Sequence, residues 1–229
     1  MNKTFKIVVE ILLALAAVGL VYLIYSSVME PVNFNKEKAR REQVGIQRLK
    51  DIRTLQVAFK GVNNHFTDDM DSLKTFYNEG KMDIIMQVGS NDDSLAVANT
   101  ARIKKQNKKI TNEELLQLYR QGEKLVFSIS TPIAVKDTLF NGREDFNIDS
   151  LAYIPFSGGR KVEMEAVVKK VSGVNVPLFE ARMPYRALLK GMDNQLRINL
   201  DSERENQNKY VGLQVGSVTA PNNNAGNWE

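Results

Sequence analysis

An uncharged apolar run near the N-terminus constrains this chain more than any other feature. From Ile11 to Val28 none of the 18 residues is charged, and 18 helical residues span about 27 Å, close to the hydrocarbon thickness of a bilayer. A cleavable signal peptide has a shorter apolar core and a small-x-small cleavage site. Tyr22 and Tyr25 stand where interfacial aromatic residues are common. The sequence therefore predicts a retained, single-pass transmembrane helix within residues 1–29.

Composition limits what the rest of the chain can do. Its 229 residues leave room for one folded domain beside the anchor, with 43% hydrophobic and 25% charged residues. There is no cysteine, and His65 is the only histidine, which excludes disulfides, thiolate nucleophiles and most zinc sites. The net charge of +4 is mild and spread along the chain, so it does not indicate nucleic-acid binding. No catalytic constellation is visible, which favours a non-enzymatic protein without a cofactor.

Glu10 interrupts the apolar segment one helical turn after Lys6, and two interpretations of it stay open. In the first, the two side chains form an i,i+4 pair near the lipid headgroups and extend towards water. In the second, the carboxylate lies within the membrane and pairs with a positive group of another subunit. The second interpretation would make Glu10 an assembly determinant.

The stretch VVEILLALAAVGL resembles the N-terminal helix of type IV pilins and type II secretion pseudopilins. In those proteins a glycine follows a glutamate by nine residues within an apolar run, and Glu10 and Gly19 keep that spacing. The resemblance implies that Glu10 neutralises the N-terminal amine of a neighbouring subunit, and Gly19 would permit close helix packing. Two positions depart from the family pattern: the junction Phe5-Lys6 has no glycine for the leader peptidase, and Ser27 replaces the usual proline.

Residues 30–66 are predicted to form an amphipathic stalk helix that continues out of the membrane. Its apolar residues recur every three or four positions, at Leu49, Ile52, Leu55, Phe59 and Val62. This stripe is expected to lie across a β-sheet, and the helix is expected to extend the contact between subunits. The full predicted assembly set is Glu10, Gly19, Lys6, Leu49, Ile52, Leu55 and Phe59. Many bitopic proteins have a comparable stalk, so an alternative without filament assembly stays open.

Residues 67–229 are predicted to form a periplasmic α+β head. Helices are expected at 94–109 and 111–122, the second with a capping box of Thr111 and Glu114 and a left-handed cap at Gly122. Strands are expected at 81–90, 124–130, 133–140, 150–156, 161–171, 176–183, 195–200 and 210–216. A short helix begins at Pro184, and the C-terminal tail is a loop. This order predicts a long N-terminal helix packed on a mostly antiparallel β-sheet, in a pilin-like plan.

Several remaining motifs have plain structural explanations. The acidic clusters at 68–71 and 92–93 offer oxygen ligands to calcium, but they lack the EF-hand offsets. Helix caps and turns are favoured there, which leaves calcium without a located site. The glycine-rich stretch 157–161 is predicted to be a hairpin turn, and His65 a partly buried loop residue.

Two further features leave their partner open. The basic run from Arg102 to Lys109 could touch anionic lipid or an acidic partner, although a solvated helix end is favoured. Trp228, the only tryptophan, lies in a polar tail. It either docks into a partner or folds back on its own domain.

The preferred interpretation is a pseudopilin-like structural subunit or accessory of an envelope secretion or filament machine. It would be single-pass in the inner membrane of a Gram-negative envelope, with its head in the periplasm. Its partners would be membrane lipid and other envelope proteins, in homo- or hetero-oligomers formed through the N-terminal helix, and not nucleic acid. Orientation follows from the resemblance, because the flanking positive charges are nearly balanced. The alternative is a bitopic scaffold or adaptor that never polymerises.

Overall fold

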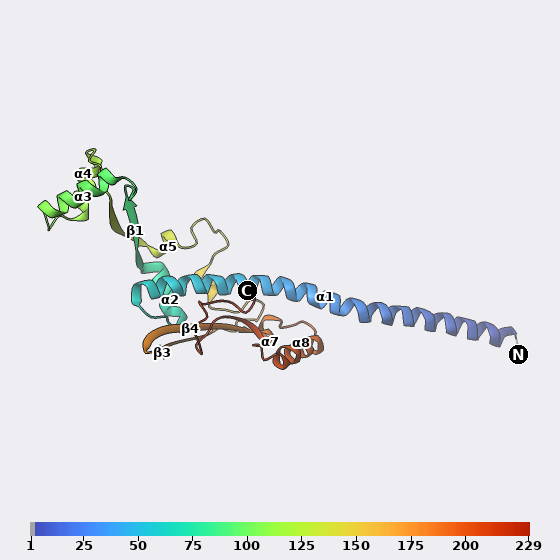
Figure 1. Cartoon of the computed structure of the whole chain (residues 1–229). Helices are drawn as coiled ribbons and strands as arrows, with labels where there is room; N and C mark the ends of the chain where they lie inside the picture. Colours follow the sequence, from blue (N-terminus) through green and yellow to red (C-terminus); the bar gives the residue numbers. More distant parts are fainter. Residues whose placement is uncertain (1–2) are drawn as a thin grey trace.

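One continuous helix, α1, organises the rest of the molecule. The computed structural model describes residues 3–229, with side chains from residue 7 onward. Helix α1 spans Lys3–Asn63, about 90 Å at 1.5 Å per residue. Figure 1 shows that its C-terminal half lies along the head, while its N-terminal half extends away from it. The helix runs through Pro31 without ending, so the predicted transmembrane and stalk segments form a single helix.

A three-stranded antiparallel sheet forms the centre of the head. Its strands are β3 (Glu163–Val171), β4 (Val174–Pro184) and β5 (Gly212–Gly216), paired in the order β3-β4-β5. The β3–β4 hairpin is closed by Ser172 and Gly173, which both have positive φ angles, as a two-residue hairpin turn of the primed type requires. The predicted combination of a long helix with antiparallel strands is confirmed, although the sheet is small.

The apolar stripe of α1 packs against this sheet and forms the main core. Leu49, Ile52 and Leu55 are fully buried, and full burial of each such side chain contributes about 1.5–3 kcal/mol. Their hydrophobic cluster includes sheet residues Phe179, Ala181, Met183, Leu213 and Val215. Gly45 permits the close approach of α1 to β5, because a Cβ atom there would lie 2.8 Å from Leu213 Cδ1.

Short helices surround the sheet and the C-terminal half of α1. They are α2 (Met70–Glu79), α5 (Val135–Thr138), α6 (Ile148–Leu151), α7 (Tyr185–Leu188) and α8 (Asn194–Asn206). Helix α7 follows Pro184 as predicted. The C-terminal tail returns to the sheet, where Val215 and Gly226 form a β-bridge, and Trp228 packs against the main core. Trp228 therefore folds back onto its own domain.

A two-stranded arm projects from the head near the C-terminal end of α1 (Figure 1). It consists of β1 (Lys81–Val88) and β2 (Phe127–Ala134), which pair antiparallel along their whole length. Neighbouring residues of a strand point to opposite faces of the ribbon. Ile85 and Met86 are both largely exposed, so at these two positions the ribbon is covered on neither face.

The arm ends in a small module, residues 89–126, that has a core of its own. It contains α3 (Ser94–Gln106) and α4 (Asn112–Arg120), packed around Leu115, Leu125 and Phe127. The predicted capping box of Thr111 and Glu114 is confirmed, as is the positive φ angle at Gly122. We call residues 89–126 the tip module.

Three of the predicted strands are wrong. Residues 133–140 contain only the end of β2 before α5 begins, residues 150–156 contain the end of α6, and residues 195–200 lie within α8. In α8, Leu196 and Leu200 are one helical turn apart and both pack on the main core, so the helical spacing prevails over the alternating pattern. The Asp193 side chain caps this helix by accepting the Leu196 N–H.

Candidate functional site

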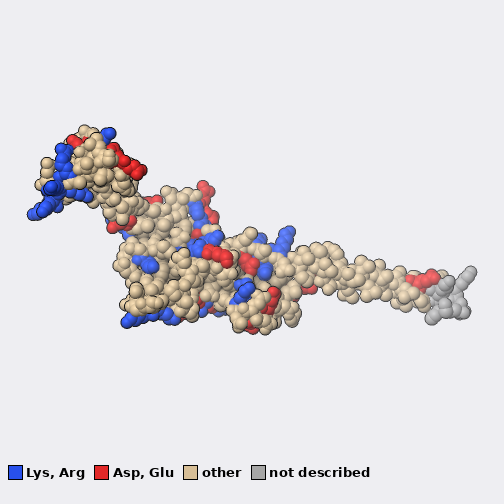
Figure 2. Space-filling model, viewed as in Figure 1, with Lys and Arg blue, Asp and Glu red and all other residues tan. Residues whose placement is uncertain are grey.

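The N-terminal half of α1 leaves a ring of apolar side chains uncovered by the rest of the chain. Apart from the half-buried Val9, the large hydrophobic residues from Ile7 to Val28 are 50–69% exposed. Figure 2 shows a rod with few charged side chains. Residues 7–28 extend about 33 Å along the helix axis, which matches a bilayer core. The helix is long and apolar enough to span a membrane. Such a surface requires a lipid or protein environment, because exposing it to water is unfavourable.

Glu10 and Gly19 both lie on this rod, on opposite sides of the helix. Glu10 is exposed, and the side chain of Lys6, its predicted partner, lies outside the described residues. A Cβ atom at Gly19 would have no atom within 4 Å, so this position is a shallow point on the rod. Nine residues at about 100° each place Glu10 and Gly19 about 180° apart around the axis. One neighbouring helix therefore cannot contact both.

The other predicted assembly residues contact the chain's own head. Leu49, Ile52 and Leu55 have no exposed surface. Phe59 is half-buried and packs edge-on against the rings of His65 and Phe76. These four side chains hold α1 on the head, and only Phe59 among them keeps part of its surface exposed.

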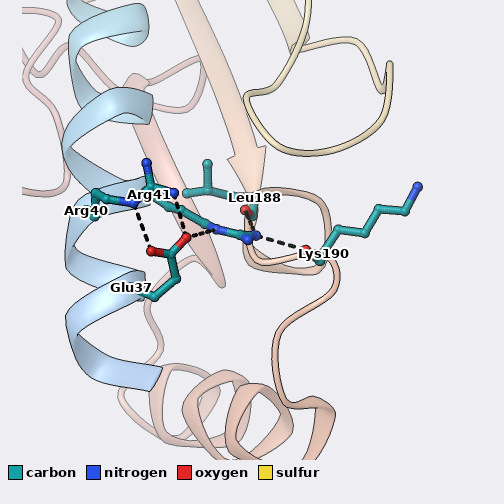
Figure 3. Close-up of polar contacts among 5 residues, drawn as sticks. All are labelled: Glu37, Arg40, Arg41, Leu188 and Lys190. Carbon is teal, nitrogen blue, oxygen red and sulfur yellow. Dashed lines mark hydrogen bonds and ion pairs between the residues drawn. The ribbon is translucent and has the colours of Figure 1, made fainter. Parts of the chain in front are cut away.

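A polar cluster joins the rod to the head, and Figure 3 shows it. Glu37 accepts hydrogen bonds from Arg40 Nε at 2.8 Å and Nη2 at 2.7 Å, and from Arg41 Nε at 2.8 Å. These hydrogen bonds lower the pKa of Glu37 from 4.5 to about 2, with the larger effect from Arg40 and the next from Arg41. Arg41 Nη1 also donates to the carbonyl oxygens of Leu188, at 3.2 Å, and Lys190, at 2.8 Å. We call these five residues the neck clamp.

The neck clamp joins α1 to the end of α7. A cation near the last carbonyls of a helix is favourable, because those groups have no partner within the helix. The guanidinium groups of Arg40 and Arg41 also lie 5.0 and 4.9 Å from the centre of the Phe156 ring. The rod and the head are thus joined as one body at this level.

Tyr185 adds a second polar contact beside the clamp. Its hydroxyl donates to Glu42 Oε1 at 2.5 Å. Burial, followed by this hydrogen bond, raises the pKa of Tyr185 above its usual range. The phenol therefore stays protonated and keeps α7 attached to α1.

An open, mostly apolar groove lies where the rod meets the head. It has a volume of about 520 Å³, and its lining includes Tyr22, Tyr25 and Met29 of α1 and Met192 of the loop before α8. Tyr22 and Tyr25 are themselves largely exposed. The predicted interfacial tyrosines therefore mark the level at which the rod leaves the head.

The acidic clusters act as helix caps. The Asp69 side chain accepts from the N–H groups of Asp71 and Ser72, and Asp93 does the same at the start of α3. Within residues 7–229 no group of three or more His, Cys, Asp or Glu side chains is arranged to hold a metal ion. His65 lies in a loop as predicted, but it is exposed rather than partly buried.

Sequence reasoning missed the neck clamp. The spacing of Glu37, Arg40 and Arg41 is the i,i+3 and i,i+4 pattern of helical ion pairs, and this signal would have found the pairs themselves. It could not have found the acceptors of Arg41, which lie 147 and 149 residues further along the chain.

A scan against models of protein families, a search of curated proteins and a search of solved structures each found no match.

Proposed function

We propose that this protein is a single-pass membrane protein of the inner membrane, with its head in the periplasm, that acts as a structural subunit of an envelope assembly. In this proposal residues 7–28 anchor the chain in lipid and also pack against the helices of neighbouring subunits. The observation that carries the proposal is the continuity of α1 from the exposed apolar rod into the buried stripe. The neck clamp supports it, because it fixes the head relative to the rod.

The pseudopilin-like form of this proposal is favoured by the placement of Glu10 and Gly19. A carboxylate on an apolar rod is costly within a bilayer unless it is paired. A shallow glycine on the opposite side suits close packing of a second helix. Neighbours on two sides would extend into an assembly larger than a dimer.

A non-polymerising scaffold or adaptor is the second candidate, and the arm favours it. The tip module lies at the end of the molecule opposite the rod (Figure 1). From residue 29 to the end of α1 the helix extends about 50 Å, and the eight-residue arm adds up to about 27 Å. Such a shape would place a binding module far from the membrane surface.

Membrane location and orientation are tested together with single-cysteine variants. The chain has no cysteine, so Ser202→Cys, at an exposed position of α8, introduces one thiol. We expect a membrane-impermeant maleimide to label this thiol in cells whose outer membrane has been permeabilised. We also expect the protein to remain in the membrane fraction after alkaline extraction. Extraction into the soluble fraction would refute the anchor, and labelling only after lysis would refute the periplasmic location.

The role of Glu10 is tested by amine crosslinking in membranes. If its carboxylate pairs with a neighbouring subunit, both Glu10→Ala and Glu10→Gln should lose crosslinked oligomers. Glu30→Gln is the matched control, since it removes an exposed carboxylate of the same helix. If both Glu10 variants crosslink as the wild type does, Glu10 is a residue near the lipid headgroups and does not pair with a neighbouring subunit. Intact-mass measurement adds a separate test, since removal of residues 1–5 is expected only of a processed, pilin-like subunit.

A further inference from the structure

The tip module carries positive charge that the rest of the described chain does not neutralise. Five cations occur within eight residues at the end of α3 and in the turn after it: Arg102, Lys104, Lys105, Lys108 and Lys109. All five are exposed. Among residues 7–229 no ion pair involves any of them. Figure 2 shows Lys and Arg side chains gathered at the end of the arm.

Two carboxylates of the tip module cap the N-termini of its helices. Asp93 accepts the Leu95 and Ala96 N–H groups at the start of α3. Glu114 accepts the Thr111 N–H at the start of α4. Asp93 therefore lies at the far end of α3 from its cations, whereas Glu114 lies at the start of the helix that follows the basic run. Helix α3 is therefore electrostatically asymmetric along its axis.

The outward face of α3 also exposes apolar side chains. Val97 is 41% exposed, and Ala98 and Ala101 lie exposed within about 100° of it around the axis. Ala96 and Thr100, on the other side of the helix, are buried in the tip module. Along about 12 Å of helix, from Val97 to Lys104 and Lys105, this face thus changes from apolar to basic.

We propose that this outward face of α3 is a docking site for a partner protein whose surface places carboxylates beside an apolar patch. Charge complementarity argues for that occupant, because the cations have no ion-pair partner among residues 7–229 and their attraction to an acidic surface speeds and orients association. The arm holds the face clear of the head. The proposal does not depend on the function proposed for the rod.

The same features argue against a lipid or nucleic-acid occupant. A helix that lies in a membrane surface separates its apolar and cationic residues around its axis, whereas α3 separates them along its axis. Binding of single-stranded nucleic acid uses aromatic side chains interleaved with cations. The run from Arg102 to Lys109 contains no aromatic residue.

The test uses the purified full-length protein in a neutral detergent and a defined probe. The probe is a fluorescent helical peptide that presents glutamates and leucines on one face, and binding is followed by anisotropy. We expect saturable binding that weakens with salt. Lys104→Glu combined with Lys105→Glu should weaken it about tenfold or more, and Val97→Ser, on the same side of the helix as Lys104, about threefold. Lys104→Gln with Lys105→Gln should give an intermediate loss while avoiding new charge at the helix end.

The matched control is Lys169→Glu combined with Lys170→Glu, which reverses an equally exposed pair of adjacent lysines on β3. This control should leave the affinity unchanged. Equal weakening by the two pairs, or no binding by the wild type, would overturn the proposal. So would tighter binding of a glutamate-only peptide, an oligothymidylate or phosphatidylglycerol vesicles. Circular dichroism of each variant checks that the helices remain folded.

Discussion

Gln56 and Thr67 are joined by two hydrogen bonds that resemble a backbone pairing. Gln56 Nε2 donates to the Thr67 carbonyl oxygen, and Gln56 Oε1 accepts the Thr67 N–H at 3.2 Å. The Gln56 side chain is fully buried. One amide on α1 thus satisfies both polar groups of a residue in the loop that leads to α2. This contact fixes the path of the chain from the long helix towards the arm.

Replacing Gln56 with alanine should destabilise the head by about 2–4 kcal/mol. The variant leaves the Thr67 N–H and carbonyl groups without partners and opens a cavity, and both effects carry a cost. Urea unfolding in detergent, followed by the fluorescence of the only tryptophan, reports on the head rather than on the rod. The exposed Gln43→Ala on the same helix should change stability by no more than about 0.5 kcal/mol. Equal effects of the two variants would contradict this account.

Elements with strong local signals were predicted well from the sequence. The stripe containing Leu49, Ile52 and Leu55 repeats at helical spacing, and all three side chains are buried as such a stripe requires. The capping box of Thr111 and Glu114 depends on residues three positions apart. Local periodicity and local hydrogen bonds decide these elements, so a single sequence is enough to find them.

Features set by contacts across the chain could not be predicted in this way. Residues 195–200 alternate like a strand, but packing of Leu196 and Leu200 on the core selects a helix. The tip module was expected to be part of one head. In the structure it has a separate core, and the pairing of β1 with β2, distant in sequence, joins it to the head. The packing of Trp228 on the main core likewise depends on distant residues. The pilin-like identity rests on residues of the rod and stays a prediction.

Acid should remove the stabilising effect of Glu37. Its pKa is lowered in the folded protein, from 4.5 to about 2, so its contribution is present above pH 4.5 and is lost as the pH falls towards 2. The thermal midpoint of Glu37→Gln should therefore lie below that of the wild type at neutral pH. The difference should shrink as the pH falls from about 5 to about 2. Thermal unfolding of the head at several pH values measures it.

Glu30→Gln is the control for this pH dependence. Glu30 is exposed on the same helix, and no ion pair involves it among the residues whose side chains are described. Its variant should follow the wild type across the whole pH range. A difference between wild type and Glu37→Gln that stays constant with pH would show that the ion pairs of Glu37 do not stabilise the neck clamp.

Gly226→Ala should release the C-terminal tail. A Cβ atom at Gly226 would lie 2.3–2.6 Å from three atoms of the Trp228 ring, so the ring must leave its place on the core. Emission of Trp228, the only tryptophan, should shift to longer wavelength and become more accessible to acrylamide. Gly61→Ala is the matched control, because a Cβ atom there would have no atom within 4 Å. Unchanged emission in Gly226→Ala would refute this packing.

The opposite directions of Glu10 and Gly19 give a test that separates the two proposed modes of assembly. At about 100° per residue, Ala17 lies within about 20° of Glu10 and Leu12 within about 20° of Gly19, whereas Leu20 lies about 90° from both. If subunits pack on two sides of the rod with like face against like face, Ala17→Cys and Leu12→Cys should both form disulfide-linked dimers in membranes. Their yields should exceed that of Leu20→Cys. Each variant carries a single thiol, because the chain has no cysteine.

Crosslinking confined to one of these faces would indicate a closed dimer, because a two-fold contact uses one face of each helix and cannot extend further. That result would favour the adaptor over the filament subunit. Similar yields at all three positions would indicate random collisions in the membrane and would refute specific packing. Dilution with added lipid separates these cases, since collisional crosslinks fall with dilution whereas crosslinks within a stable assembly persist.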